Sequence, residues 1–536
     1  MKINMRRSHS GILPSSAQVV QKTVWVRASV ACFLGGVFAQ SLAATHNAAS
    51  VPYMPSWEAR HAISLLVDRA NLPLTSNHWP LPSDAVVHAL SQFDTNDTSL
   101  IAAKAKVLDE IARQQNTSRL RLELRSASER PVGFGDDAIP GSSLGAQGAT
   151  QRSDSSPDGV ATWAMQLGVR YGAASNSTRQ AFNGNHVPHY QASLEGSSAA
   201  LGFQGWQLQA FQGQQWWGPG WQSSLVDGSN NAPWVGVGVQ RSSTEPSLHA
   251  WLRWMGPWNL DVFVAKAQDP LVVEGQPQGF LFSGARLSMR PAPWLELGLS
   301  RGLQFGGVGR PSGAVSFVKA FFGQQVNKEV TDTFGDSSGQ IAGYDLRMRC
   351  PSPWGQCAFY TQWMGEDAAG ETPPMPYKFM SLWGAEVVWD EGRYRLFTEY
   401  VDTHSFSLPW DTNQPFPGYV NGIYQQGYTN GARWAGSGFG SGSRVWSIGW
   451  MDAQSRTRLL LHSGSVGRSL GTFTPGIDSP HGSLFAWDLT REFVYQRLRV
   501  RPSLGFTHLD RGQDQGSNRR NQWRFGVGLE LPLSSH

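Results

Sequence analysis

Charged side chains are scarce in this chain of 536 residues, because Asp, Glu, Lys and Arg together make up 16% of it, against about 25% in typical soluble domains. Long apolar runs are also missing, since none after residue 50 reaches the roughly 18 residues that a membrane-spanning helix needs. Trp is abundant, with 23 copies. This combination favours a barrel that crosses a membrane with strands, and it leaves a large soluble β-protein as the alternative.

Cysteine is rare, with three copies. Cys32 lies in an apolar run near the N-terminus, whereas Cys350 and Cys357 flank a short loop between two strand-like runs. In an oxidising compartment the spacing of this pair predicts a hairpin disulfide. A metal-binding pair is disfavoured because no His, Asp or Glu lies nearby, and two free buried thiols are the remaining alternative.

Residues 1–43 have the pattern of an export signal. Five basic residues precede an apolar run over residues 28–39, and small residues follow it. Removing this segment takes five of the 44 Lys and Arg residues, which leaves 39 against 40 Asp and Glu. The apparent basic balance therefore belongs to the signal, and the remaining chain gives no reason to expect nucleic-acid binding.

The pattern of residues 44–117 predicts a small packed helical module, and it contains no residues that indicate a catalytic or binding site. Ser56 can cap a first helix whose apolar stripe includes Ile63 and Leu66, and two further helices are expected at residues 83–90 and 97–114.

From residue 118 the apolar pattern changes to a period of two, which predicts a β-barrel over residues 118–536. The expected fold is an all-β transmembrane barrel of about 18 antiparallel strands, preceded by the helical module. Strands are expected at 118–126, 161–172, 188–200, 205–214, 234–242, 247–254, 258–267, 279–289, 294–304, 340–350, 357–365, 378–389, 393–403, 443–452, 456–465, 483–493, 497–509 and 521–533.

Short turns and longer loops alternate along most of the barrel, as they do in outer-membrane barrels with periplasmic turns and external loops. The helical module then lies on the short-turn side, in the periplasm. Two short links, 201–204 and 243–246, and two long ones, 173–187 and 215–233, break the alternation. By this count the loop 215–233 falls on the periplasmic side.

The final strand, 521–533, has the clearest pair of faces. One face is apolar and includes Trp523 and Phe525, while the other carries Arg524. An arginine facing lipid at the bilayer midplane costs about 2–4 kcal/mol, so the charged face should line the lumen. This strand is expected to close the barrel by pairing with residues 118–126.

Trp216, Trp217 and Trp221 surround a rigid Gly-Pro-Gly turn. Flat indole rings can stack on sugars, so a glycan site is one interpretation. A structural cluster that plugs the lumen or anchors the interface is the other. The structural interpretation is favoured, because the loop falls on the side away from surface glycans.

Several segments, in order along the chain, resemble the Wzi-type capsule assembly proteins of the Gram-negative outer membrane. They include WWGPGWQSSLVDGSNNAP at 216–233, LRWMGPWNLDVFVAK at 252–266, YTQWMGEDAAG at 360–370 and IYQQGYTNGARWAGSG at 423–438. The resemblance covers nearly all of the chain after the signal. It implies a barrel of about 18 strands with a periplasmic helical bundle. It also implies a lectin-like role in holding capsular or related polysaccharide at the cell surface.

Candidate glycan contacts come from the chemistry of the loops. Loop 404–442 is expected to face outside, and its aromatic and polar side chains suit polymeric sugar, since rings stack and polar groups satisfy hydroxyls. Loops that fold inward to close the pore explain the same aromatics. The candidates, with Arg310 in loop 305–339 for acidic polymer, are Trp410, Asp411, Asn413, Tyr419, Tyr424, Tyr428, Arg433 and Trp434.

An enzymatic reading has little support, because the chain has neither a His-Glu-x-x-His pair nor the spacing of a calcium loop. We therefore expect a non-catalytic monomer of the outer membrane without cofactor or metal. Its expected partners are surface polysaccharide and outer-membrane lipid. A diffusion porin for sugars or anions is the first alternative, and an outer-membrane hydrolase is the second.

Overall fold

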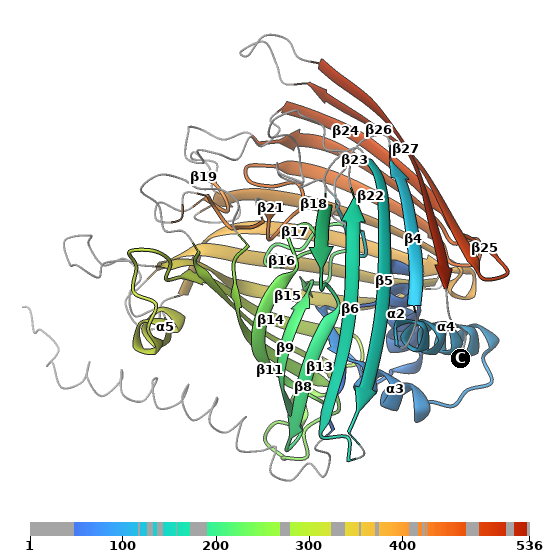
Figure 1. Cartoon of the computed structure of the whole chain (residues 1–536), viewed down its shortest axis with the longest axis horizontal. Helices are drawn as coiled ribbons and strands as arrows, with labels where there is room; N and C mark the ends of the chain where they lie inside the picture. Colours follow the sequence, from blue (N-terminus) through green and yellow to red (C-terminus); the bar gives the residue numbers. More distant parts are fainter. Residues whose placement is uncertain are drawn as a thin grey trace, which may run out of the picture.

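The architecture of the chain is that of a closed β-barrel with helices at one end (Figure 1). The computed structural model describes residues 48–115, 118–125, 132–136, 143–156, 158–171, 190–268, 279–322, 338–352, 355–369, 375–406, 416–420, 424, 426–431, 433–467, 482–510 and 519–532.

Twenty-one strand segments form the barrel in the described part of the chain. Three of them, β7, β19 and β25, have only two to four residues, and the longer strands beside them also pair directly with each other. Eighteen strands therefore make up the wall, as predicted. The segments are β4 (Ser118–Arg125), β5 (Ser143–Ser155), β6 (Ala161–Tyr171), β7 (Tyr190–Ser193), β8 (Ser197–Phe203), β9 (Trp206–Gly213), β11 (Trp234–Arg241), β12 (Trp258–Lys266), β13 (Leu281–Ala292), β14 (Leu295–Phe305), β15 (Ser338–Ser352), β16 (Gly355–Ala369), β17 (Met375–Trp389), β18 (Tyr394–Phe406), β19 (Phe416–Pro417), β22 (Arg444–Asp452), β23 (Thr457–Val466), β24 (Gly482–Arg491), β25 (Phe493–Tyr495), β26 (Leu498–Asp510) and β27 (Arg519–Pro532).

The barrel closes where the sequence predicts. Strand β27 pairs with β4 in an antiparallel register that runs from Gly526 opposite Arg125 to Pro532 opposite Arg119. Trp523 and Phe525 point outward and are more than half exposed, whereas Arg524 is buried and donates to Asp488 at 2.8 Å. The alternation of apolar and polar residues therefore sets the two faces of the wall.

Two strand predictions are wrong, and their errors cancel in the count. Residues 247–254 form no strand, because their apolar residues recur every three to four positions. Leu252 and Met255 instead pack on the outside of the wall beside Trp258. Conversely, β5 lies inside the predicted loop 127–160. Apart from Leu144 this strand has no large apolar residue, so the sequence shows no period of two there.

With these two corrections, short and long connections between successive strands alternate along the barrel almost throughout. At one rim the connections have two to six residues, except for residues 242–257. At the other rim they have five to 37 residues, and seven of nine have at least 14. We call these the short-turn rim and the long-loop rim. The loop 214–233 starts at the long-loop rim, so the prediction that it falls on the opposite side is wrong.

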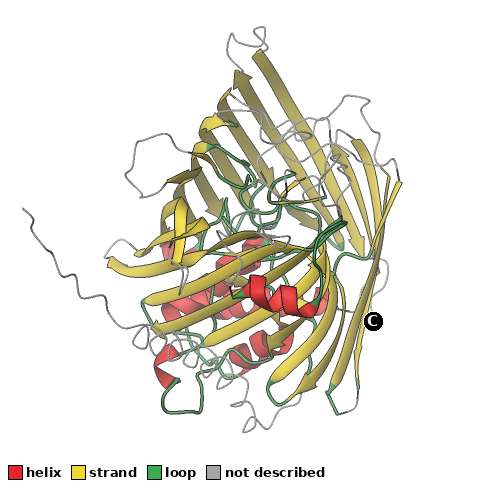
Figure 2. Ribbon diagram, turned by 90° about the vertical axis from the view of Figure 1, so that its left-hand side faces the viewer, coloured by secondary structure: helices red, strands yellow, loops and turns green. Residues whose placement is uncertain are grey.

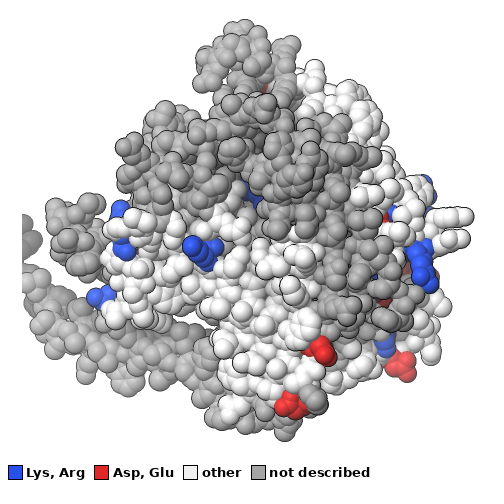
Figure 3. Space-filling view, viewed as in Figure 1, with Lys and Arg blue, Asp and Glu red and all other residues white. Residues whose placement is uncertain are grey.

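The outer surface of the wall is apolar around its middle. In the face shown in Figure 3, the described surface is mostly uncharged, and Lys, Arg, Asp and Glu lie towards its edges. Many exposed side chains of the strands are large and apolar, including Trp383, Phe359, Ile448 and Phe485. Such a band is what a barrel in a lipid bilayer presents to acyl chains.

The helical module lies at the short-turn rim, and its helices agree with the predicted segments. Ser56 caps α2 (Trp57–Ala70) by accepting from the backbone N–H of Ala59, and Asp97 caps α4 (Thr98–Gln114). Between them lies α3 (Ser83–Ser91). Among the described residues, no helix is long and apolar enough to cross a membrane. Figure 2 shows these helices within one end of the ring of strands.

The remaining short elements connect the module to inward loops or border the barrel. Two 3-10 turns, η2 and η3, lie at the short-turn rim, and α5 lies outside the wall. The described residues also form three two-stranded sheets, of which one joins the module to loop 214–233, one lies within the module and one is a local hairpin. The bounds are β1 (Pro52–Tyr53) with β3 (Leu81–Pro82), β2 (His78–Trp79) with β10 (Trp216–Trp217), β20 (Thr429–Asn430) with β21 (Arg433–Trp434), η2 (Arg253–Met255), η3 (Asp390–Gly392) and α5 (Ala314–Phe321).

Cys350 and Cys357 are direct cross-strand partners in β15 and β16. Their Cα atoms are 5.2 Å apart, and a disulfide joins them. The two strands are already connected by a short turn, so the bond closes a small loop and fixes the register of one hairpin.

Buried charges join the module to the wall. Arg347 of β15 donates to both oxygens of Asp68 in α2, at 2.8 and 2.6 Å, and to Glu386 of β17 at 2.7 Å. Glu386 also accepts from Arg395 of β18, whose Nε donates to Nδ1 of His61 in α2 at 2.9 Å. All five residues are almost fully buried. The two arginines balance the two carboxylates, so removing any one of these four side chains leaves a buried net charge.

We predict that Asp68→Asn weakens docking of the module by about 3–5 kcal/mol, because Arg347 then loses a buried carboxylate. Hydrogen exchange of the α2 amides measures this directly. Asp109→Asn is the matched control, since Asp109 pairs with Arg113 on the exposed side of α4 and such a pair contributes about 0.3–0.5 kcal/mol. Equal exchange in both variants would show that the buried pair does not hold the module.

Candidate functional site

The lumen is filled by the module and by loops that enter from the long-loop rim. Residues 132–136 and 214–233 fold inward, as do the described residues between 416 and 443, and Figure 2 shows loop segments inside the ring of strands. The Arg60 guanidinium of α2 lies 4.3 Å from the ring centroids of both Phe134 and Trp221. Elements from the two rims therefore meet inside the barrel.

The predicted Trp cluster forms the centre of this filling. Trp216, Trp217 and Trp221 are each at most 5% exposed. Trp216 pairs with Trp79 in the small sheet of β10 and β2, so loop and module share backbone hydrogen bonds. The indole Nε1 of Trp221 donates to Glu386 at 2.7 Å. In this structure the three rings pack inside the barrel and present no face to an external sugar.

Loop 214–233 is tied to the wall by a carboxylate of β18. Glu399 accepts from the backbone N–H groups of Trp221, Gln222 and Ser223, and from the hydroxyl of Tyr360. Three successive amides converging on one carboxylate fix the path of the loop, since charge-assisted hydrogen bonds are the stronger kind. Loop 214–233 is therefore held in one position inside the barrel. Together with the other inward loops it forms what we call the plug.

Burial lowers the pKa of two α2 side chains that enter the lumen, Arg60 and His61. Desolvation lowers the pKa of Arg60 to about 9. Desolvation and the nearby Arg395 lower the pKa of His61 to about 3, so this imidazole is neutral. Its Nε2–H donates to the backbone oxygen of Gly392 at 2.7 Å, while Nδ1 accepts from Arg395. The hydrogen bonds thus select one tautomer.

Four predicted glycan contacts are buried in the plug, which corrects their assignment. Tyr419, Tyr424, Tyr428 and Trp434 are each at most 5% exposed. The Tyr419 hydroxyl donates to the backbone oxygen of Leu225 in the other inward loop at 3.0 Å. Inward folding that closes the pore, the alternative left open by the sequence, accounts for these rings.

The other predicted contacts differ in their placement. Trp410, Asp411 and Asn413 lie outside the described residues. Arg433 and Arg310 are partly exposed on the long-loop side. The structure therefore does not bring the predicted contacts together into one exposed site.

An exposed aromatic site at the long-loop rim was missed by the sequence analysis. Phe416 of β19 is 62% exposed, and the Lys378 ammonium lies 5.5 Å from its ring centroid. Beside it, Arg444 lies 5.6 Å from the Phe406 ring and donates to Asp402 at 2.9 Å. Rings and cations at one exposed rim can stack on sugars and pair with acidic groups. No local sequence pattern marks this site, because its residues are brought together by the pairing of β18 with β17, β19 and β22.

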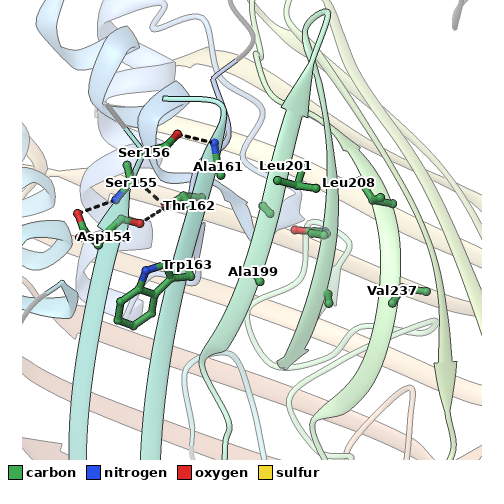
Figure 4. Close-up of a pocket in the computed structure, with 13 residues that line it drawn as sticks. Asp154, Ser155, Ser156, Ala161, Thr162, Trp163, Ala199, Leu201, Leu208 and Val237 are labelled. Atoms are coloured by element: carbon green, nitrogen blue, oxygen red, sulfur yellow. Dashed lines mark hydrogen bonds between the residues drawn. The ribbon is translucent and has the colours of Figure 1, made fainter. Parts of the chain in front are cut away.

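A hollow of about 950 Å³ lies on the outer face of the wall (Figure 4). Trp163, Leu201, Leu208 and Val237 border it and are 44–57% exposed. Alanines from β8 and β9 form its floor. An apolar hollow on the outward face suits acyl chains and not a hydroxyl-rich polymer.

Among the residues that the structure describes, no group of three or more His, Cys, Asp or Glu side chains is placed to hold a metal ion.

Comparisons with known proteins agree with this architecture. The family model described as "Capsule assembly protein Wzi" matches residues 142–496. A Klebsiella pneumoniae protein described as an uncharacterized 55.8 kDa protein in the cps region is 28% identical over 490 residues, covering 89% of this chain and 88% of that protein. Among solved structures, Escherichia coli Wzi, described as an outer-membrane, carbohydrate-binding β-barrel involved in group 1 capsule assembly, matches with a TM-score of 0.72. It is 22% identical, over 91% of this chain and all of that one.

We predict that the purified protein forms no steady channel in planar bilayers, because its lumen is filled. Gly213 and Trp234 are direct cross-strand partners, so residues 214–233 can be replaced by an Asn-Gly turn. That variant should conduct steadily, while a variant with an altered turn at residues 204–205 on the other rim should stay closed. Steady conductance of the unmodified protein would contradict a filled lumen.

We also predict that acid loosens the module. In the docked state His61 stays neutral down to about pH 3, whereas an undocked imidazole binds a proton near its ordinary pKa of 6.5. Docking should therefore lose about 1.4 kcal/mol per pH unit as pH falls below 6.5. Hydrogen exchange of α2 at pH 6.5 and pH 5 tests this, after correction for intrinsic exchange. His61→Gln keeps a donor and an acceptor, so it should reduce the pH dependence. An identical pH dependence in this variant would rule out His61 as the source.

Proposed function

The chain belongs to the Wzi family of capsule assembly proteins, and we propose that it binds exported polysaccharide at the cell surface and anchors it without catalysis. The observation that carries this proposal is the filled lumen. A barrel in which the module and the inward loops meet offers a polymer its outer rim in place of a passage through it. The carbohydrate binding attributed to the Escherichia coli protein is extended to this chain on that basis.

The orientation follows from the two rims. In outer-membrane barrels short turns face the periplasm and long loops face outside, so we propose that the module is periplasmic and the Phe416 rim external. In this proposal residues 1–43 are the export signal, residues 44–117 the module and residues 118–536 the barrel of a monomer. The apolar outer surface supports an outer-membrane location with lipid around the wall.

The two alternatives have less support. A diffusion porin requires an open lumen, which the buried Trp and Tyr side chains occupy. A hydrolase requires a nucleophile or a metal in an accessible cleft. The segment GSSLG at 141–145 has the Gly-x-Ser-x-Gly spacing of one hydrolase class, but Ser143 begins barrel strand β5. It lacks the strand-to-helix turn that exposes such a serine.

We propose that acidic or neutral sugar units meet the rim around Phe416 and Lys378. The ring supplies a flat apolar face for C–H groups, and the ammonium can pair with a carboxylate of the polymer. Arg433, Trp410, Asp411 and Asn413 remain candidates for further contacts. This assignment moves the proposed contact from the buried tyrosines to the exposed edge of the same loop.

Deleting the protein should shift polysaccharide from the cell-bound to the shed fraction while total polymer stays constant.

Replacing both rim residues, as Phe416→Ala/Lys378→Gln, should weaken binding of purified polymer about tenfold, which corresponds to about 1.4 kcal/mol for one ring and one cation. Phe359→Ala is the matched control, because Phe359 is equally exposed but faces outward from the middle of the wall. Unchanged retention in the deletion strain would refute anchoring. Normal binding by the double variant would refute this contact site.

A further inference from the structure

Helix α5 lies outside the barrel wall, away from helices α2–α4 (Figure 1). Its inner face packs on the last residues of β14 and the first residue of β13, which lie at the long-loop rim. The ring centroids of Phe317 and Phe305 lie 5.0 Å apart with the rings tilted at 47°, and Ala320 and Phe321 join the cluster around Leu303. The helix is thus seated on the part of the wall that would meet the outer leaflet.

An outward-facing arginine fixes this seat. Arg301 of β14 shares the outward face with Leu299 and Leu303, where an uncovered charge would be costly. Its Nη2 donates to the backbone oxygen of Ala320 at 3.1 Å, and its guanidinium lies 5.7 Å from the Phe321 ring centroid. The end of α5 therefore covers Arg301, which explains why the helix lies on the wall and not in the lumen.

The opposite face of α5 is apolar and uncovered. Val315 is 70% exposed, Val318 49% and Phe322 42%, and Val308 just before the helix is 78% exposed. Helical spacing puts Lys319 between Val315 and Phe322 on this face. An apolar face with a lysine in it is the pattern of a helix that lies in a membrane interface, where the lysine stem is buried and the ammonium reaches the headgroups.

Three cations surround this face. Lys319 is exposed, Arg310 is partly exposed, and Lys266 ends β12 on the outward side, opposite Leu281 of the α5 cluster. The described segments around the helix, 264–268, 279–282 and 305–322, contain no Asp or Glu. Within those segments the charge is therefore of one sign, and the partner that complements it is an anion attached to an apolar body.

We propose that α5, with Lys266, Arg310 and Lys319, is a docking surface for a phosphate-bearing acylated glycolipid of the outer leaflet, of the lipid A class. Acyl chains pack on Val315, Val318 and Phe322, and the phosphates pair with the cations. Arg310 thereby changes its assignment from acidic polymer to lipid. This inference rests on the outer-membrane location and on the orientation proposed above, with the long-loop rim external, but it does not require that the protein bind polymer.

Native mass spectrometry of the detergent-purified protein tests the proposal with bisphosphorylated, monophosphorylated and dephosphorylated lipid A, and with phosphatidylethanolamine. Binding should be tightest for the bisphosphorylated form. Each cation near an anionic membrane surface contributes about a fivefold factor, equivalent to about 1 kcal/mol. Arg310→Gln/Lys319→Gln should therefore weaken binding of that form about 30-fold. Val315→Ser/Val318→Ser should weaken binding of all three forms of lipid A.

Arg253→Gln/Arg491→Gln is the matched control, since it removes two exposed cations at the short-turn rim. It should retain the lipid as the unmodified protein does, and heat-modifiable gel mobility confirms that each variant is a folded barrel. Equal lipid binding by the α5 variant, or an equal loss in the control, would overturn the proposal. Loss of polymer binding with lipid binding intact would overturn it too, by assigning the cations to polysaccharide. Loss of lipid binding with polymer retention intact would support it and leave the proposed function untouched.

Discussion

The inward face of the barrel is polar, and the lumen that it lines is filled with protein. An inward charge is therefore costly unless it finds a partner inside, because an unpaired buried charge costs several kcal/mol. Arg286 of β13 and Asp345 of β15 are both fully buried and bind each other. Asn77 from the module completes the group by donating to Asp345 at 2.8 Å and accepting from Arg286. The module and the inward loops are thus the partners that the wall requires.

This constraint separates the two surfaces with which the protein can meet its surroundings. Because protein fills the interior, the proposed binding surface for polymer consists of exposed groups at the long-loop rim such as Phe416 and Lys378. The outer wall presents apolar side chains, for which lipid is the proposed partner. At the same rim, α5 combines an apolar face with cations and differs from the Phe416 surface in chemistry. One rim therefore carries two distinct surfaces.

Period-two segments such as the final strand predicted the wall well, because alternation alone decides which residues meet lipid and which meet the interior. Where large apolar residues were few, as in β5, or were spaced as in a turn, as in residues 247–254, the pattern failed. The site was harder to predict. Tyr419 has the composition of a glycan contact, but its hydroxyl binds Leu225, nearly two hundred residues away in sequence. Composition cannot distinguish a ring that faces sugar from one that packs in a plug.

We propose that the barrel stays plugged while it binds polymer at its rim. Hydrogen exchange of the full-length protein, with and without purified polysaccharide, distinguishes this from entry of the polymer into the lumen. The amides of Trp221, Gln222 and Ser223 should exchange slowly in both states, since Glu399 holds them. Amides near Phe416 should gain protection when polymer is bound. Faster exchange of the three plug amides on binding, without protection at the rim, would contradict it, because the polymer would then be entering the lumen.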